Sequence, residues 1–243
     1  MYIIKLNAID STNAYLKSLS LKQTQKDFTV VVADEQKQGR GQMGTSWQAE
    51  ASKNLTFSVF KEVSNLEIKD QFYISIAVAL AISKALLELQ IPKIKIKWPN
   101  DILSENKKIA GILIENVIKN NKLYGSVIGV GLNVNQKFFN DLPNASSMQL
   151  ITGVVYNKDE VLHTILKHIE YYLKKVNEPN FTKLKQDYEA LLFRIKKPST
   201  FKSSTEQIFS GFIKGITDDG KLVLLLEDDI VKEFDLKEIQ LLY

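Results

Sequence analysis

The chain has 243 residues, of which 44% are apolar, so it is long enough to bury a full core and to form one large domain plus a small one. It contains no cysteine, which excludes disulfides, thiolate metal sites and cysteine nucleophiles and favours a cytoplasmic location. The net charge of +4 is too small and too dispersed to predict nucleic-acid binding, and favours only an acidic partner or an anionic substrate. The N-terminus lacks a signal-peptide pattern, and no apolar run reaches the roughly 18 residues that span a bilayer, so we expect a soluble protein.

The first third of the chain predicts alternating strands and helices. Polar residues at 10–13 are typical of a helix start, and the β-branched run at 28–35 is typical of a buried strand. The segment 70–90 is apolar on nearly all sides and predicts the main buried helix. The expected elements are strand 2–6, a helix to residue 19, strand 28–35, loop 36–46, strand 54–60 and helix 70–90.

The remainder predicts antiparallel strands, two amphipathic helices and a second, smaller β domain. The expected strands are 93–98, 101–103, 108–118 and 122–134; an irregular stretch at 135–157 precedes helices 158–176 and 180–193, which are separated by Asn177-Glu178-Pro179. Short strands with turn signals follow over 208–242. We therefore expect an α/β (α+β) fold with a mixed, largely antiparallel sheet and flanking helices at 1–195, and a small β domain at 196–243.

Arginine is rare in this chain, and one arginine stands between two glycines. Of 32 basic residues only Arg40 and Arg194 are arginine, and Arg40 lies in the tract 39-GRGQMG-44. Arginine is hard to replace where a phosphate or carboxylate accepts two parallel hydrogen bonds, and glycine lets a ligand approach the backbone. The tract therefore predicts an anion-binding loop, although an ordinary surface turn fits it equally well.

Two further segments carry candidate site residues. In 97-KWPND-101, Pro99 restricts the backbone, so that Asp101 would leave a rigid corner as a Mg²⁺ or ribose ligand, or simply as an Asx turn. Strict alternation in the strand at 107–115 would place Lys108 on an apolar face with Ala110 and Ile112, where it could neutralise phosphate charge or extend to water.

The lack of cysteine and the position of the two histidines limit the reactions that this chain could catalyse. With no cysteine, and with both histidines in a late helix, neither a cysteine or serine nucleophile with a histidine base nor a histidine-based metal centre is expected. A cationic, glycine-lined site made from Arg40, Lys108 and backbone amides suits phosphoryl or adenylyl chemistry, in which catalysis rests on positioning and charge neutralisation.

The chain resembles biotin-protein ligases in the succession of DSTN (10–13), Gln36, GRG (39–41) with Trp47 after it, KWPND (97–101), KIAGILIE (108–115) and GVGLNVN (129–135). The resemblance covers residues 1 to about 190 and is specific because several motifs agree in order and spacing. It implies a fold like that of class II synthetases with an SH3-like C-terminal domain. It also implies an ATP-dependent biotin–acetyl-CoA-carboxylase ligase that makes biotinyl-5'-AMP with Mg²⁺ and transfers biotin to a lysine of a carboxylase biotin carrier domain.

The resemblance also implies residue roles. Arg40 and Lys108 would be catalytic, and loop 36–46 would close over the reactive adenylate and keep water out. Asp101 would lie near Mg²⁺ or hold the lysine. The biotin-binding residues would be Ser11, Thr12, Asn13, Gln36, Gly39, Arg40, Gly41, Lys108, Gly111, Gly129 and Gly131; those binding ATP or the adenylate would be Arg40, Trp47, Asn100, Asp101, Lys108 and Asn133.

Two departures from the family pattern matter. Many relatives carry another basic residue after GRG, whereas this chain has Gln42 and Met43, which predicts a looser hold on the adenylate. Some relatives begin with a DNA-binding domain, whereas this chain opens on the strand at residues 2–6, so we expect no DNA binding. Acceptor identity, biotin affinity and pairing of two copies stay open.

Two rival functions remain. A lipoate-protein ligase or octanoyl transferase is similar in fold and acyl chemistry, but KWPND together with GRG favours biotin. A non-catalytic biotin- or nucleotide-binding sensor would not need Lys108.

Overall fold

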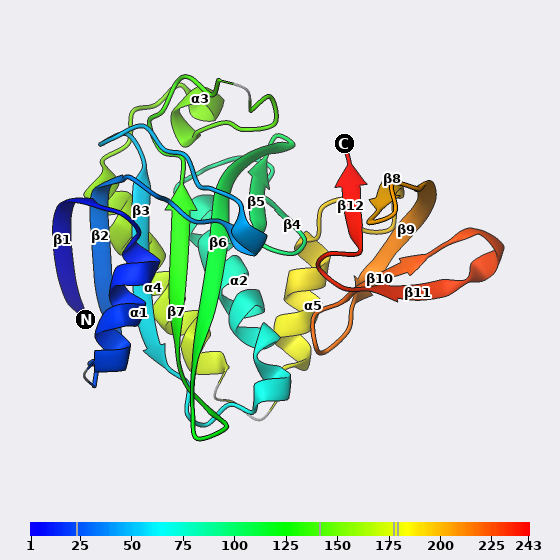
Figure 1. Cartoon of the computed structure of the whole chain (residues 1–243). Helices are drawn as coiled ribbons and strands as arrows, with labels where there is room; N and C mark the ends of the chain where they lie inside the picture. Colours follow the sequence, from blue (N-terminus) through cyan, green and yellow to red (C-terminus); the bar gives the residue numbers. More distant parts are fainter. Residues whose placement is uncertain (23, 141, 177, 179) are drawn as a thin grey trace.

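The computed structural model describes residues 1–22, 24–140, 142–176, 178 and 180–243. Its large sheet has seven strands in the order β1-β2-β3-β7-β6-β5-β4 (Figure 1). Only β1 and β2 are parallel neighbours, and every other pair is antiparallel, which confirms the predicted mixed, largely antiparallel sheet. The strands are β1 (Tyr2–Ile9), β2 (Thr29–Gln36), β3 (Leu55–Glu62), β4 (Lys95–Lys97), β5 (Asp101–Ser104), β6 (Lys107–Lys119) and β7 (Lys122–Leu132).

Helices cover both faces of this sheet. Helix α1 (Thr12–Lys22) packs on one face through a small cluster that includes Leu16, Val31 and Phe60. The other face carries the main core, to which α2 (Phe72–Glu88), α4 (Lys158–Lys175) and α5 (Thr182–Leu191) contribute (Figure 1). Short helical turns are α3 (Met148–Thr152), η1 (Gln42–Gly44), η2 (Ile68–Asp70) and η3 (Glu227–Asp229).

Helix α2 corrects one expectation from the sequence. The stretch Ile68–Glu88 is long and apolar enough to cross a membrane by length and composition, although no uninterrupted apolar run predicts it. Most of that stretch is buried between the sheet, α4 and α5, and Ile74, Leu80 and Leu86 have no exposed surface. Its apolar character is therefore accounted for by the core that it fills.

The C-terminal segment forms a separate five-stranded antiparallel sheet in the order β11-β10-β9-β8-β12. It lies beside α5 and the β4 edge of the large sheet (Figure 1). The strands are β8 (Pro198–Ser203), β9 (Ile208–Ile216), β10 (Leu222–Leu225), β11 (Val231–Phe234) and β12 (Ile239–Leu242). This sheet fits the predicted small β domain, but its first strand begins ten residues before the first strand expected from the sequence.

Most predicted elements are present with ends shifted by a few residues. Helix α3 lies in the stretch expected to be irregular. Two residues of the expected break between α4 and α5, Asn177 and Pro179, lie outside the described residues.

Candidate active site

A cavity of about 420 Å³ lies where the loop after β2 crosses β6 and β7, and it extends to the KWPND turn and the C-terminal sheet. Thirteen of the fifteen residues proposed from the sequence line it, namely Ser11, Thr12, Asn13, Gln36, Arg40, Gly41, Trp47, Asn100, Asp101, Lys108, Gly111, Gly129 and Gly131. Segments from five parts of the chain thus meet in one site.

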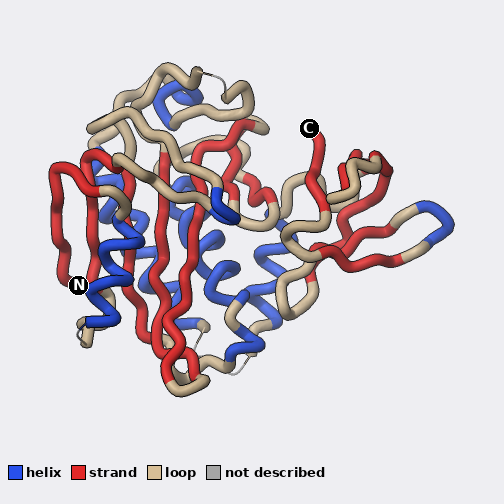
Figure 2. Tube along the Cα trace, viewed as in Figure 1, coloured by secondary structure: helices blue, strands red, loops and turns tan. Residues whose placement is uncertain are grey.

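The loop that carries Arg40 is closed on itself. The backbone N–H of Gly41 donates to the carbonyl of Thr45 at 2.7 Å, and that of Trp47 donates to the carbonyl of Gly39 at 2.9 Å. A Cβ on Gly39 would lie 2.3 Å from the Trp47 carbonyl oxygen, so a larger residue would force these two strands of the loop apart. Figure 2 shows this loop, with the short turn η1, crossing over the strands of the large sheet. Its conformation leaves Arg40 exposed above the cavity.

Trp47 returns the loop to the sheet by packing on glycines. A Cβ on Gly131 would lie 2.3 Å from the indole ring of Trp47, and one on Gly111 would lie 3.1 Å from it. The ammonium of Lys108 lies 5.6 Å from the centre of the same ring, within the range of a cation–π contact. The glycines at 111 and 131 therefore serve first to seat Trp47 and Lys108 in the site.

The start of α1 builds the opposite, uncharged end of the cavity. The amide oxygen of Gln36 accepts hydrogen bonds from the backbone N–H of Thr12 at 2.8 Å and from its hydroxyl at 3.0 Å. Gln36 lines the cavity, and within the described chain its amide N–H₂ group makes no hydrogen bond, so it is available as a donor. The buried hydroxyl of Ser11 lies beside it, and Phe57 adds an apolar wall.

Asn13 lines the cavity, but its side chain is used to hold α1 on the sheet. Its amide nitrogen donates to the carbonyl of Leu113 at 3.2 Å and to Glu115 at 3.0 Å, and its oxygen lies 2.6 Å from the Ser58 hydroxyl. The oxygen would be only 2.3 Å from a Cβ on Gly129, so glycine is needed there for close contact. Asn13 shapes the cavity rather than presenting free polar atoms to it.

Glu115, in β6, contacts two side chains of this helix, Asn13 and Lys17. Partial burial alone would raise the pKa of its carboxyl, but hydrogen bonds from Lys17 and Asn13, with the charges of Lys17 and Arg40, lower it below its usual value. The Lys17 ammonium lies 2.8 Å from the carboxylate. Glu115 is thus ionised at neutral pH and ties α1 to β6.

The KWPND turn and β6 build the charged end. The carboxylate of Asp101 forms one ion pair with Lys108 at 2.6 Å and another with Lys97 at 3.4 Å. Its side chain is only 13% exposed. The side chain of Asn100 donates to the carbonyl of Ile112 at 2.8 Å, which holds the turn against β6. Of the two roles considered for Asp101, the geometry favours holding the lysine.

The orientation of Lys108 differs from the strict alternation predicted for its strand. Leu103 pairs with Lys108 and Ile102 with Ala110, so Ile109 is an extra residue that bulges β6. Ile109 and Ala110 both enter the main core, whereas Lys108 lies on the cavity side with Gly111. The β-bulge therefore places the side chain of Lys108 in the cavity. Bulges near active sites often change the direction of a side chain in this way.

Two predicted residues do not line the cavity. Gly39 acts within the loop, as described above, and Asn133 is buried behind the site. The Asn133 amide nitrogen donates to the carbonyl of Ser146 at 2.9 Å. Within the described chain its side-chain oxygen and the buried indole nitrogen of Trp47 have no hydrogen-bond partner.

Sequence reasoning missed the part of the site that comes from the C-terminal sheet. Leu236 and Gln240 line the cavity, as does Lys97. The ring of Tyr243 lies 5.3 Å from the Lys97 ammonium. Burial, followed by the charge of Asp101, raises the pKa of Tyr243. Lys97 stands in the KWPND motif, but no local pattern marks Leu236, Gln240 or Tyr243, and only the tertiary packing brings those three to the charged end of the site.

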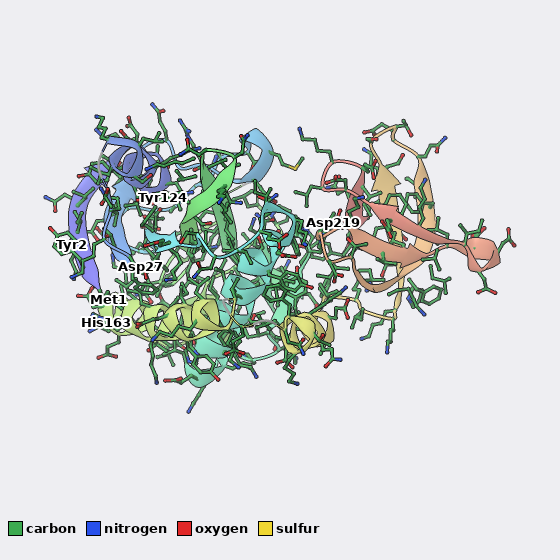
Figure 3. All side chains as sticks on the ribbon, turned by 90° about the horizontal axis from the view of Figure 1, so that it is seen from below. Met1, Tyr2, Asp27, Tyr124, His163 and Asp219 are labelled. Carbon is green, nitrogen blue, oxygen red and sulfur yellow. The ribbon has the colours of Figure 1, made fainter. Side chains whose placement is uncertain are left out.

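Histidine takes no part in this cavity. His163 and His168 lie on α4, where His163 bonds within its own helix and His168 contacts Glu88. Figure 3 shows His163 on the outer side of that helix. The cavity lining among the described residues thus holds three cations, one carboxylate and neither cysteine nor histidine.

The sequence of this chain, which forms the fold and the cavity described above, matches the model of a known protein family. The profile of the "Biotin/lipoate A/B protein ligase family" matches residues 6–133, and the chain belongs to that family.

Several solved and curated proteins are similar. A biotin protein ligase from Aquifex aeolicus in complex with biotin and ATP superposes with a TM-score of 0.82 at 30% identity, over 99% of this chain and 98% of that one. The bifunctional ligase/repressor BirA of Bacillus subtilis is 30% identical over 84% of this chain and 63% of its own length. A biotin–[acetyl-CoA-carboxylase] ligase of Mycobacterium tuberculosis is 29% identical over 88% of this chain and 79% of its own. The chain thus spans just under two thirds of the Bacillus subtilis relative.

Proposed function

We propose that this protein is a biotin-protein ligase that forms biotinyl-5'-AMP from biotin and ATP and then transfers biotin to a lysine of a carboxylase biotin carrier domain. The observation that carries the proposal is the division of one cavity into an uncharged end at α1 and a cationic end at Lys108, with the Arg40 loop above both. The names of the relatives support the choice of biotin.

The uncharged end suits the ureido ring of biotin. The N–H₂ group of Gln36 and the hydroxyl of Ser11 supply donors for a carbonyl oxygen, while Phe57, Leu113 and Val130 offer apolar contact to the rest of the bicycle and its chain. Among the described residues this end carries no charged lining side chain, which fits a neutral ring.

The cationic end suits a reacting carboxylate and triphosphate. Arg40, Lys97 and Lys108 face a single carboxylate, Asp101, so the lining carries a net charge of +2 there. In the first step a biotin carboxylate oxygen attacks the α-phosphorus of ATP, and the bond to pyrophosphate breaks. In the second, the acceptor lysine nitrogen attacks the acyl carbon, AMP leaves, and the lysine loses a proton. Lys108 and Arg40 would stabilise the phosphate charge of both steps.

Magnesium fits this site as a companion of ATP rather than as a resident of the protein. Asp101 is held by two lysines, and the described residues contain no group of three acidic or histidine side chains that could hold a metal. Mg²⁺ commonly keeps several waters and binds through substrate phosphates with one or two carboxylates. Asp101 is the carboxylate within reach, and the ion would shield phosphate charge.

The acceptor would reach the site along the open edge of β6. Within the described chain, β5 pairs with β6 only from Lys107 to Gly111. Asn100 bonds both backbone groups of Ile112, and beyond Ile112 no strand of the described chain pairs with this edge. An extended acceptor segment could add to this edge, as could a second copy of the chain. Measuring backbone hydrogen exchange with and without a carrier domain tests whether the acceptor pairs with this edge. We expect slower exchange at residues 112–118, and unchanged exchange there would exclude edge pairing.

The first half-reaction separates the candidate functions. Radiolabelled pyrophosphate should exchange into ATP only when biotin is present, because adenylate formation is reversible. Exchange supported by lipoate but not by biotin would favour the lipoate ligase of the same family. Binding of biotin without exchange would instead favour a sensor, and absence of both would overturn the proposal. We further propose a cytoplasmic location, in keeping with the lack of cysteine.

A further inference from the structure

The C-terminal sheet contacts the large sheet directly beside the charged end of the cavity. The turn between β9 and β10 carries Gly220, which is buried and has a φ of +94°, in the left-handed region. Its carbonyl oxygen accepts a hydrogen bond of 2.9 Å from the indole nitrogen of Trp98. A Cβ at this position would lie 2.3 Å from the ring of Phe72 at the start of α2. Glycine is therefore required here for both backbone conformation and space.

Trp98 lies in the sequence between Lys97 and Pro99, which both line the cavity. Lys97 precedes it, and the Trp98–Pro99 peptide bond, which is cis, leads on to Asn100 and Asp101. The half-buried indole of Trp98 packs against the core rather than lining the main cavity. The tryptophan of KWPND thus joins the charged end of the site to the C-terminal sheet.

The same sheet reaches the charged end a second time. Leu236, in the turn between β11 and β12, and Gln240, in β12, line the main cavity. Leu236 also borders a neighbouring cavity of about 210 Å³, which shares Pro99 and Asn100 with the first. The position of these side chains depends on how the C-terminal sheet is seated against the large one.

The β9–β10 turn also contacts the large part of the molecule through Asp218, an exposed side chain that bonds the buried Tyr73. Asp218 accepts hydrogen bonds from the hydroxyl of Tyr73 at 3.0 Å and from Lys185 at 2.7 Å, but its side chain is 76% exposed. Exposed ion pairs contribute little. Figure 3 shows the neighbouring Asp219 on the side of the small sheet that faces the large part of the molecule. The buried contact at Gly220 is thus the better candidate for setting the position of the sheet.

Resting on the proposed adenylation, we propose that Gly220 is a positioning residue. It seats the C-terminal sheet against Trp98, so that Leu236 and Gln240 complete the end of the cavity that receives ATP. The biotin end is built by α1 and by β2, β3, β6 and β7, and its polar contacts do not involve the C-terminal sheet. Disturbing Gly220 should therefore change the use of ATP and leave biotin binding intact.

The test compares two glycine substitutions in the whole protein. Gly220→Ala places a methyl group against Phe72, whereas Gly153→Ala, at a φ of +78° with nothing within 4 Å, introduces similar backbone strain without a clash. In biotin-dependent pyrophosphate exchange, Gly220→Ala should raise the KM for ATP about ten-fold or more, while biotin affinity by calorimetry stays within about two-fold. Gly153→Ala should leave both values near those of the unaltered protein.

A second variant tests the positioning role of Gly220 if Gly220→Ala does not fold. Trp98→Phe keeps an aromatic ring but removes the donor to the Gly220 carbonyl, and the same split between ATP and biotin is expected. An unchanged KM for ATP, or equal losses for ATP and biotin, in a folded variant would overturn the positioning role. Unaltered protein that binds biotin but shows no exchange would overturn the proposed function, and this inference with it.

Discussion

Lys108 is the residue on which the proposed chemistry depends most. It reaches the cavity because Ile109 bulges the strand, and Asp101 and Trp47 fix its ammonium from two sides. Lys108→Ala should lower the rate of biotin-dependent pyrophosphate exchange by about 100-fold or more, since a cation at the phosphate is lost, while biotin still binds. Lys122→Ala, at an exposed position in the β6–β7 hairpin, is the matched control and should retain full exchange. Similar rates in the two variants would remove Lys108 from the mechanism.

Gln42 is the residue on which the predicted looser hold on the adenylate rests. It lines the cavity next to Arg40, and its backbone carbonyl accepts bonds from Thr45, so its side chain is not needed to close the loop. Gln42→Arg should slow release of biotinyl-AMP several-fold, because a second cation would face the phosphate. Rapid filtration after single-turnover adenylation measures this release. An unchanged release rate would show that the missing cation does not loosen the hold.

At the scale of elements, one carboxylate adds an electrostatic link between α1 and β6 to the apolar contacts of the helix. The ionised Glu115 binds Lys17 and Asn13, and its pKa is lowered in the folded state. A lowered pKa stabilises the fold at pH values above the ordinary carboxyl range, and this contribution is lost as the pH falls through the folded value. Glu115→Gln should therefore reduce the free energy of unfolding at pH 7 by about 1–2 kcal/mol.

Denaturant unfolding across pH checks the sign of that effect. The difference between Glu115→Gln and the unaltered protein should shrink as the pH falls below about 4, where an unperturbed glutamate takes up its proton. Glu67→Gln, at a side chain that is 69% exposed, should show little difference at any pH. A difference for Glu115 that persists unchanged in acid would mean that its charge does not hold the helix.

The elements differ in how well the sequence predicts them. The sequence predicts β2 and α2 because the residues of each are mostly apolar, and apolar residues are usually buried. The bulge at Ile109 is not, because it follows from pairing with β5, which no local pattern reveals. Strand β8 begins at a proline and is half exposed, which hides it from pattern reasoning.

The residues of the site also differ in how well the sequence predicts them. Ser11, Gln36 and Arg40 stand in motifs, so their presence in the cavity could be predicted from the sequence. Leu236 and Gln240 could not, since an isolated leucine and glutamine in a short β segment carry no signal of their own. They reach the cavity only because the two sheets pack together.

At the scale of the molecule, the two ends of one cavity are built by different parts of the chain. The large sheet and α1 supply the uncharged end, and the KWPND turn with the C-terminal sheet completes the charged end. The Arg40 loop passes above both, which suits an intermediate that water would destroy. If the proposed function holds, the small sheet contributes to catalysis by completing the charged end, although among the described residues it supplies no charged group to the cavity lining.

The central claim is the transfer of biotin to protein, and intact mass measurement of an acceptor tests it most directly. A biotin carrier domain incubated with this protein, biotin, ATP and Mg²⁺ should gain one biotinyl group at a single lysine. The gain should require both biotin and ATP and should be absent with Lys108→Ala. An acceptor that stays unmodified while biotinyl-AMP accumulates, or one that gains a lipoyl group instead, would contradict the account.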